Sequence, residues 1–213
     1  MTRERWTSLL TALVGGSVLV GLYSFQNHPH SYPDYIVTNV ASLLWIPMLA
    51  VMLILRQEPS AFGFGLGDLR WSMRLAGVLY IGVLPFLVYA SRLAGFQQYY
   101  PIQKWAESSL YFFGYYELTY GMYLFCWEFF FRGFLLFGLS RTIGIVSVFV
   151  QAAAFGIMHL GKPPQEVLAS FATGIVLGLV AYRSKSFVAC FVVHWAAAVT
   201  FDILIILARR GAF

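Results

Sequence analysis

Five ionisable residues lie inside or at the edge of long apolar stretches in the second half of the sequence: Glu128, Arg132, His159, His194 and Asp202. A charged side chain near the centre of a bilayer costs at least about 2.5–3.5 kcal/mol, and it is retained where it faces other helices and finds a partner. Residues of this kind on three of the last four apolar segments predict a polar site built inside a membrane protein.

The residue types in this set could catalyse hydrolysis. Glu128 and Arg132 share one helix face at a spacing of i and i+4 and can pair, although such a pair could also serve only to let the segment insert. A carboxylate in an apolar pocket can act as a general base towards water. Imidazoles can relay protons or donate a hydrogen bond to an oxyanion, so His159 and His194 could assist. Asp202 follows His194 by about 12 Å of helix, which predicts a supporting place at the mouth of the site.

A metal-dependent reaction is the second reading of the same residues. Glu128, His159 and His194 match the ligand count of a catalytic zinc site, which keeps one position for water. The sequence contains no His-Glu-x-x-His motif, so the usual zincin helix is absent. The residues leave two possibilities open, a Zn²⁺ cofactor or no cofactor.

Helices must position these side chains. The chain has 213 residues, of which 60% are hydrophobic and 11% charged, and its mean hydropathy is +0.73. Soluble domains carry about 25% charged residues, and a bilayer admits only helices or closed barrels. Apolar windows fall near 6–25, 36–55, 73–93, 109–139, 143–160, 165–182 and 186–208. We therefore predict an all-α, polytopic transmembrane bundle of about 7–8 helices around an intramembrane polar cavity, forming a single domain over residues 1–213.

Two segments depart from the simple pattern of spans. The window 109–139 is longer than an untilted span, which predicts either one tilted helix or two pieces hinged near Gly114 or Gly121. Residues 61–74 mix aromatic, glycine and basic residues, which predicts a segment lying along the membrane interface.

Basic residues predict the orientation. Arg3 and Arg5 precede the first apolar window, and the connection 26–35 contains no Lys or Arg, which favours a cytoplasmic N-terminus. Seven spans would then place Arg209 and Arg210 outside, so either an eighth helical piece exists or the rule fails at this end. The net charge of +5 is best explained by anchoring at the lipid bilayer, and no nucleic-acid partner is expected. The short chain and simple loops suggest a bacterial inner-membrane protein.

Three motifs follow one another in an order that resembles a known family. They are Glu-x-x-x-Arg-Gly at 128–133, Phe-x-x-x-His at 155–159, and His194 in the last apolar window. Together they resemble the CPBP (Abi) family of intramembrane proteases, which includes CAAX prenyl endopeptidases and bacteriocin-processing enzymes. The resemblance covers about residues 105–208. It implies a bundle of about eight helices that cleaves a membrane-tethered peptide or protein near the membrane surface.

The chain departs from the family pattern at two positions. The family has two adjacent glutamates before the Arg, and Trp127 stands in the place of the first. The family also has Asn four residues after the last His, where this chain has Ala198. Our hypothesis is therefore that Glu128 itself activates water, His159 helps to hold or deprotonate it, His194 stabilises the oxyanion, and Arg132 orients Glu128. The alternatives are a catalytically silent peptide-binding protein, such as an immunity or assembly factor, and an ion-coupled transporter, which the absence of internal repeats disfavours.

Overall fold

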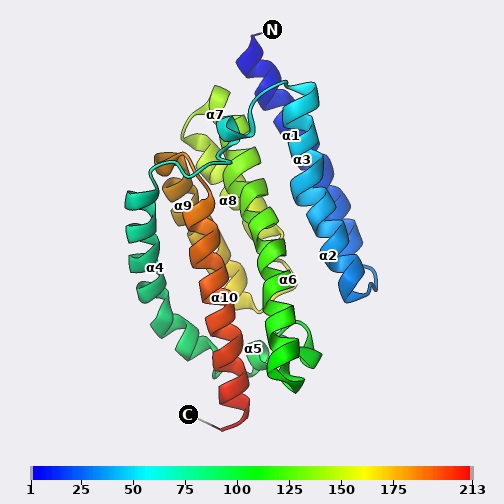
Figure 1. Cartoon of the computed structure of the whole chain (residues 1–213), viewed down its shortest axis with the longest axis vertical. Helices are drawn as coiled ribbons and strands as arrows, with labels where there is room; N and C mark the ends of the chain where they lie inside the picture. Colours follow the sequence, from blue (N-terminus) through cyan, green and yellow to red (C-terminus); the bar gives the residue numbers. More distant parts are fainter. Residues whose placement is uncertain (1, 212–213) are drawn as a thin grey trace.

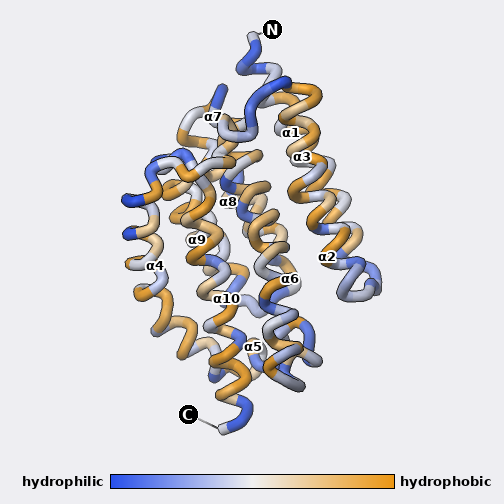
Figure 2. The backbone as a smooth tube through the Cα atoms, in the orientation of Figure 1, coloured by the Kyte–Doolittle hydropathy of each residue, from blue (hydrophilic) through white to orange (hydrophobic). Residues whose placement is uncertain are grey.

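The protein is a bundle of helices (Figure 1). The computed structural model describes residues 2–211, and no strand occurs among them. The predicted all-α bundle is therefore confirmed. Six helical segments are long and apolar enough to cross a membrane: Arg3–Gln26, Tyr32–Ile54, Leu69–Ala90, Leu110–Ile143, Pro164–Ser184 and Val188–Arg209. Figure 2 shows hydrophobic residues along the helices and hydrophilic residues gathered towards the two ends of the bundle.

The first two spans form a hairpin at one side of the bundle (Figure 1). Helix α1 (Arg3–Gln26) begins at Thr2, whose hydroxyl oxygen accepts a hydrogen bond from the Arg5 amide. The second span is helical throughout but not uniformly α-helical, because Pro47 lacks the N–H that an α-helix requires. Its α-helical and wider π-helical pieces are α2 (Tyr32–Val40), η1 (Ala41–Trp45), α3 (Ile46–Leu49) and η2 (Ala50–Ile54).

The third span, α4 (Leu69–Ala90), begins earlier than predicted. Asp68 caps it, because its carboxylate accepts a hydrogen bond from the Trp71 amide at 3.2 Å. The prediction that residues 61–74 lie along the interface is therefore wrong for the part from Leu69 onwards, which is helical. The short elements around this span are η3 (Pro59–Phe62), α5 (Ala94–Tyr99) and η4 (Lys104–Ser108).

One long central element carries the first motif. It consists of α6 (Leu110–Glu128), the π-helical segment η5 (Phe129–Leu135) and α7 (Leu136–Ile143). Most of its apolar window is buried inside the protein, whereas the other spans expose most of theirs. The predicted hinge near Gly114 or Gly121 is wrong, since α6 runs without a break through both. The irregular turns lie instead directly after Glu128, and π-helical turns within helices are frequent at functional sites.

After the central element the chain forms three more helices, and these helices and the turns between them carry the other polar residues of the predicted site. The helices are α8 (Val146–Ile157), α9 (Pro164–Ser184) and α10 (Val188–Arg209). Helix α8 has 12 residues, or about 18 Å, which is shorter than the hydrocarbon core of a bilayer. The seven predicted apolar windows thus correspond to six long spans and this short helix. The two termini lie at opposite ends of the bundle (Figure 1).

Basic residues gather at the end of the bundle where the N-terminus lies. Eight of the 14 Lys and Arg residues begin or end helices there: Arg3, Arg5, Arg56, Arg70, Arg74, Arg141, Arg183 and Lys185. Only Glu4, Glu58 and Asp68 oppose them at this end. At the other end Arg209 pairs with Glu107 and donates hydrogen bonds to the carbonyls of Gln97 and Tyr100. Arg209, at the end of the bundle opposite the N-terminus, is thus a cation held by protein groups.

Candidate active site

Glu128 is the centre of the polar site. It is the last residue of α6, and its side chain is fully buried. Its Oε1 accepts a hydrogen bond from Arg132 at 3.1 Å and lies 2.6 Å from the Nδ1 of His194 on α10. Its Oε2 is also buried and has no hydrogen-bond partner within residues 2–211. One oxygen of the carboxylate therefore fixes the helices together, and the other remains able to accept a proton or a hydrogen bond.

Arg132 supplies the charge that offsets Glu128. It lies in the π-helical segment η5, one turn after Glu128, and neither side chain has any exposed surface. Its guanidinium carbon lies 3.9 Å from the centre of the Phe155 ring, which is a cation–π contact. Truncating one partner of such a buried ion pair leaves an uncompensated charge, which costs far more than the pair itself contributes. The sequence-based pairing of the two residues is present in the structure.

His159 joins the site from the turn after α8. Its Nδ1 lies 2.8 Å from the carbonyl oxygen of Phe155, so the proton on Nδ1 is the one that donates this hydrogen bond. The other ring nitrogen, Nε2, is then an acceptor in the neutral ring. His159 lies outside the six spanning helices, and burial, followed by the nearby charge of Lys162, lowers its pKa from 6.5 to about 2. The ring is therefore neutral near pH 7.

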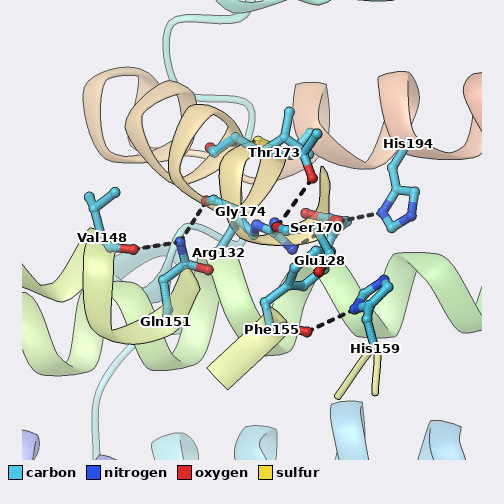
Figure 3. Close-up of polar contacts among 12 residues, drawn as sticks. Glu128, Arg132, Val148, Gln151, Phe155, His159, Ser170, Thr173, Gly174 and His194 are labelled. Atoms are coloured by element: carbon cyan, nitrogen blue, oxygen red, sulfur yellow. Dashed lines mark hydrogen bonds and ion pairs between the residues drawn. The ribbon is translucent and has the colours of Figure 1, made fainter. Parts of the chain in front are cut away.

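Phe155 brings the two histidines to the same place. Its ring centre lies 4.4 Å from that of His159 and 6.2 Å from that of His194. Figure 3 shows both imidazoles on the same side of Glu128, with Arg132 behind the carboxylate. A quarter of the His194 side chain is exposed, so this side of the site is not fully covered by protein. Glu128 and His194 are thus in direct contact, and His159 lies against the Phe155 ring that also faces His194.

Trp127 fills the position where the resembling family has its first glutamate. Its ring lies 5.9 Å from His159, 4.9 Å from Phe131 and 6.0 Å from Phe155, and only 3% of the residue is exposed. It forms an apolar wall beside His159. Ala198, the other departure, lies one turn after His194 on α10 and is half-buried.

Asp202 lies in a different cluster from the one expected for a supporting residue. It is 2% exposed, and its carboxyl group lies against that of Glu117, a second buried acid on α6. Neither Asp202 Oδ1 nor either carboxyl oxygen of Glu117 has another hydrogen-bond partner among residues 2–211. Glu117 also uses its backbone carbonyl, which accepts a hydrogen bond from Trp195 at 3.0 Å. In the sequence, Glu117 and Asp202 are single acidic residues in different apolar windows, and nothing there indicates that they are in contact.

Gln151 is a buried polar residue that the sequence analysis did not single out. Its Nε2 donates to the carbonyls of Val148 at 2.9 Å and Gly174 at 2.8 Å, which ties α8 to α9 (Figure 3). Gly174 and Gly178 permit this close approach, because a Cβ on either would meet α8 at 3.0 Å or less. The amide thus fixes the hairpin that presents His159, and a lone Gln within an apolar run was its only signal in the sequence.

The residues present do not form a zinc site. Within residues 2–211 no group of three or more His, Cys, Asp or Glu side chains is arranged to hold a metal ion. Glu128 also directs Oε1 to Arg132 and His194. The metal-ligand role considered for Glu128, His159 and His194 therefore has no matching donor geometry among the described residues.

The comparisons with known proteins agree with the order of the motifs. Residues 109–200 match the model of the family described as type II CAAX prenyl endopeptidase Rce1-like. The searches of curated proteins and of solved structures found no match. The matched segment contains Glu128, Arg132, His159 and His194, and it lies in a chain with six apolar helices of spanning length. Over this segment, somewhat less than half of the chain, the protein is similar to the Rce1-like family, and its six apolar helices of spanning length make it an integral, multi-pass membrane protein.

Proposed function

We propose that the protein is an intramembrane endopeptidase that hydrolyses a peptide bond in a membrane-tethered protein or peptide. The observation that carries the proposal is the buried Glu128 carboxylate, whose Oε1 binds Arg132 and His194 and whose Oε2 has no partner among the described residues. A general base needs a free acceptor atom held in a fixed position. Glu128 Oε2 meets this need, because the ion pair and the histidine fix the carboxylate through its other oxygen.

In the proposed reaction, Glu128 Oε2 and His159 Nε2 accept the two hydrogen bonds of one water molecule. The water oxygen attacks the carbonyl carbon of the scissile peptide bond, and its proton passes to Glu128. The negative charge that develops on the carbonyl oxygen is stabilised by the Nε2–H of protonated His194, whose Nδ1–H is held by Glu128. The proton on Glu128 then passes to the amide nitrogen as the peptide bond breaks, which restores the carboxylate. Arg132 orients Glu128 throughout.

The substrate is a chain tethered to the membrane beside the protein, because such a chain can reach a site within the bundle. The family name points to prenylated CAAX tails, whereas the residues of this chain do not select among a lipidated tail, a leader peptide and a sorting tail. We propose an N-terminus in the cytoplasm, because the basic residues at that end of the bundle outnumber the acidic ones.

A catalytically silent peptide-binding protein is the second candidate. Trp127 favours it, because an apolar ring stands beside His159 where the family pattern has a carboxylate. The two candidates differ in a single measurable product, the new chain ends that cleavage creates.

The test is a comparison of membrane-protein termini in cells that carry the intact protein, Glu128→Gln, His159→Ala, or His28→Gln as a matched control on an exposed loop. We expect a set of termini present with the intact protein and His28→Gln and absent with the two site variants. Those termini also identify the substrate. An unchanged set, with every variant inserted at a normal level, would establish the silent peptide-binding protein instead.

A further inference from the structure

A groove lies between α4 and α9, away from the site of Glu128. It has a volume of about 730 Å³, and Leu75 and Leu79 on α4 face Val176 and Leu179 on α9 across it. Val176 and Leu179 are 41% and 44% exposed. Both helices are spanning segments, so this apolar groove opens to the hydrocarbon of the bilayer rather than to water.

Cations close one end of the groove. Arg183 and Lys185 line it at the end of α9, and Arg70 and Arg74 alternate with groove residues in the first turns of α4. None of the four forms a salt bridge with any residue from 2 to 211. They belong to the end of the bundle that carries eight of the 14 basic residues. Unpaired cations at one membrane interface attract anionic headgroups.

Aromatic rings fix the two cations at the mouth. The Arg183 guanidinium lies 5.2 Å from the centre of the Trp71 ring, and Lys185 Nζ lies 4.5 Å from the centre of the Tyr182 ring. Lys185 also adopts a left-handed backbone conformation, with φ of 62°, as the residue that ends α9. Trp and Tyr favour the membrane–water interface, so the mouth lies at headgroup level. From Arg183 to Val176 the helix rises about 10 Å, which leads from that level into the hydrocarbon.

We propose that this groove binds one anionic phospholipid, with the phosphate at Arg183 and Lys185 and an acyl chain between α4 and α9. Charge complementarity selects this occupant. A zwitterionic lipid would bring its own cation to a mouth that already holds unpaired cations, whereas an anionic lipid neutralises them. An apolar groove that continues from the cations accounts for the chain of the same molecule. The bound lipid would join α4 to α9, and α9 is tied to the hairpin that presents His159.

The test uses the purified full chain in mild detergent with phosphatidylglycerol and phosphatidylcholine of identical acyl chains at equal concentration, measured by native mass spectrometry. We expect phosphatidylglycerol to be retained at least tenfold more than phosphatidylcholine. The variant Arg183→Gln/Lys185→Gln should bind phosphatidylglycerol about thirtyfold more weakly, since each interfacial cation contributes about fivefold. The control Arg3→Gln/Arg5→Gln removes the same charge at the same end of the bundle and should keep the preference.

A second pair of variants tests the groove itself. Val176→Trp fills the groove without changing any charge, and we expect it to lose most of the bound phosphatidylglycerol. Val78→Trp is the matched control, because Val78 is 65% exposed on α4 and lies outside the groove lining. Thermal unfolding of each variant confirms that it remains folded. Four results would each overturn the proposal. The first two are equal retention of the two lipids by the intact protein and an unchanged preference in Arg183→Gln/Lys185→Gln. The other two are an equal loss of binding in Arg3→Gln/Arg5→Gln and full binding by Val176→Trp.

Discussion

His194 Nδ1 lies 2.6 Å from Glu128 Oε1, and this contact joins the final helix to the end of α6 inside the bundle. The carboxylate thereby holds the Nδ1–H of His194, and it leaves Nε2 facing the partly exposed side of the site. The pair also fixes the place of α10 relative to the motif Glu-x-x-x-Arg-Gly. Two of the three segments that carry the motifs are thus joined through a single hydrogen bond.

The first prediction concerns the coupling between these two residues. Glu128→Gln and His194→Gln should each lower the rate of peptide cleavage by about 10²–10⁴, the usual contribution of positioned proton transfer. The double variant should be little worse than either single one, because the two side chains act as a unit. The rate of cleavage of a membrane-reconstituted substrate checks this, with His28→Gln as the control. Losses that multiply in the double variant would show that the two residues act independently.

The second prediction concerns the buried ion pair. Arg132→Gln should lower the free energy of unfolding by about 3–5 kcal/mol, because it leaves the buried Glu128 carboxylate without its cation. The double variant Glu128→Gln/Arg132→Gln should be more stable than Arg132→Gln, since it has no unpaired charge to bury. Denaturant unfolding in detergent measures both. If the double variant is less stable than Arg132→Gln, the broken ion pair is not the reason why Arg132→Gln loses stability.

The third prediction concerns acid sensitivity. Burial lowers the pKa of His159 to about 2 in the folded protein, whereas the unfolded chain has the ordinary value of 6.5. Between these values the unfolded state binds more protons, so the contribution of His159 to stability is complete above about pH 6.5 and is lost as the pH falls. The slope is at most about 1.4 kcal/mol per pH unit. Unfolding measured from pH 7.5 to 5 should show a weaker decline in His159→Gln. Parallel declines in the two proteins would contradict the neutral, buried state of this ring.

Much of the architecture follows from the sequence, because a bilayer enforces helices and their length. The seven apolar windows each contain a helix, and the order of Glu128, His159 and His194 along the chain predicted a common site. The sequence did not predict the π-helical turns after Glu128, since the i, i+4 spacing of Glu128 and Arg132 is satisfied by an α-helix as well. The sequence also did not predict that α8 ends after only 12 residues, which places His159 within the bundle.

The pairing of Glu117 with Asp202 could not be predicted for a different reason. Each acid is separately expensive in an apolar helix, and only the packing of α10 against α6 shows that the two acids lie together. The helical distance from His194 to Asp202 predicted that Asp202 lies about 12 Å along the helix from that histidine. It could not say which residue faces it.

The fourth prediction separates this acidic pair from catalysis. Asp202→Asn keeps a donor for the Glu117 carboxylate, so cleavage should remain within about threefold of the intact protein. Asp202→Leu leaves Glu117 buried without a partner and should lower stability by about 1–3 kcal/mol. Parallel assays of cleavage and thermal unfolding distinguish the two effects. A loss of cleavage in Asp202→Asn as large as that in His194→Gln would place Asp202 in the catalytic set.

The fifth prediction tests how the helix packing positions His194. A Cβ on Gly121 would lie 2.6 Å from Cε2 of Trp195, the residue after His194, so Gly121→Ala must displace this ring and with it α10. A displacement of about 1 Å can cost 10²-fold in rate, and we expect Gly121→Ala to lower cleavage by tenfold or more. Gly114→Ala is the control on the same helix, because a Cβ there meets nothing within 4 Å. Adding Trp195→Phe to Gly121→Ala removes the indole atoms that clash and should restore part of the rate. If both glycine variants behave alike, the position of His194 does not depend on this contact.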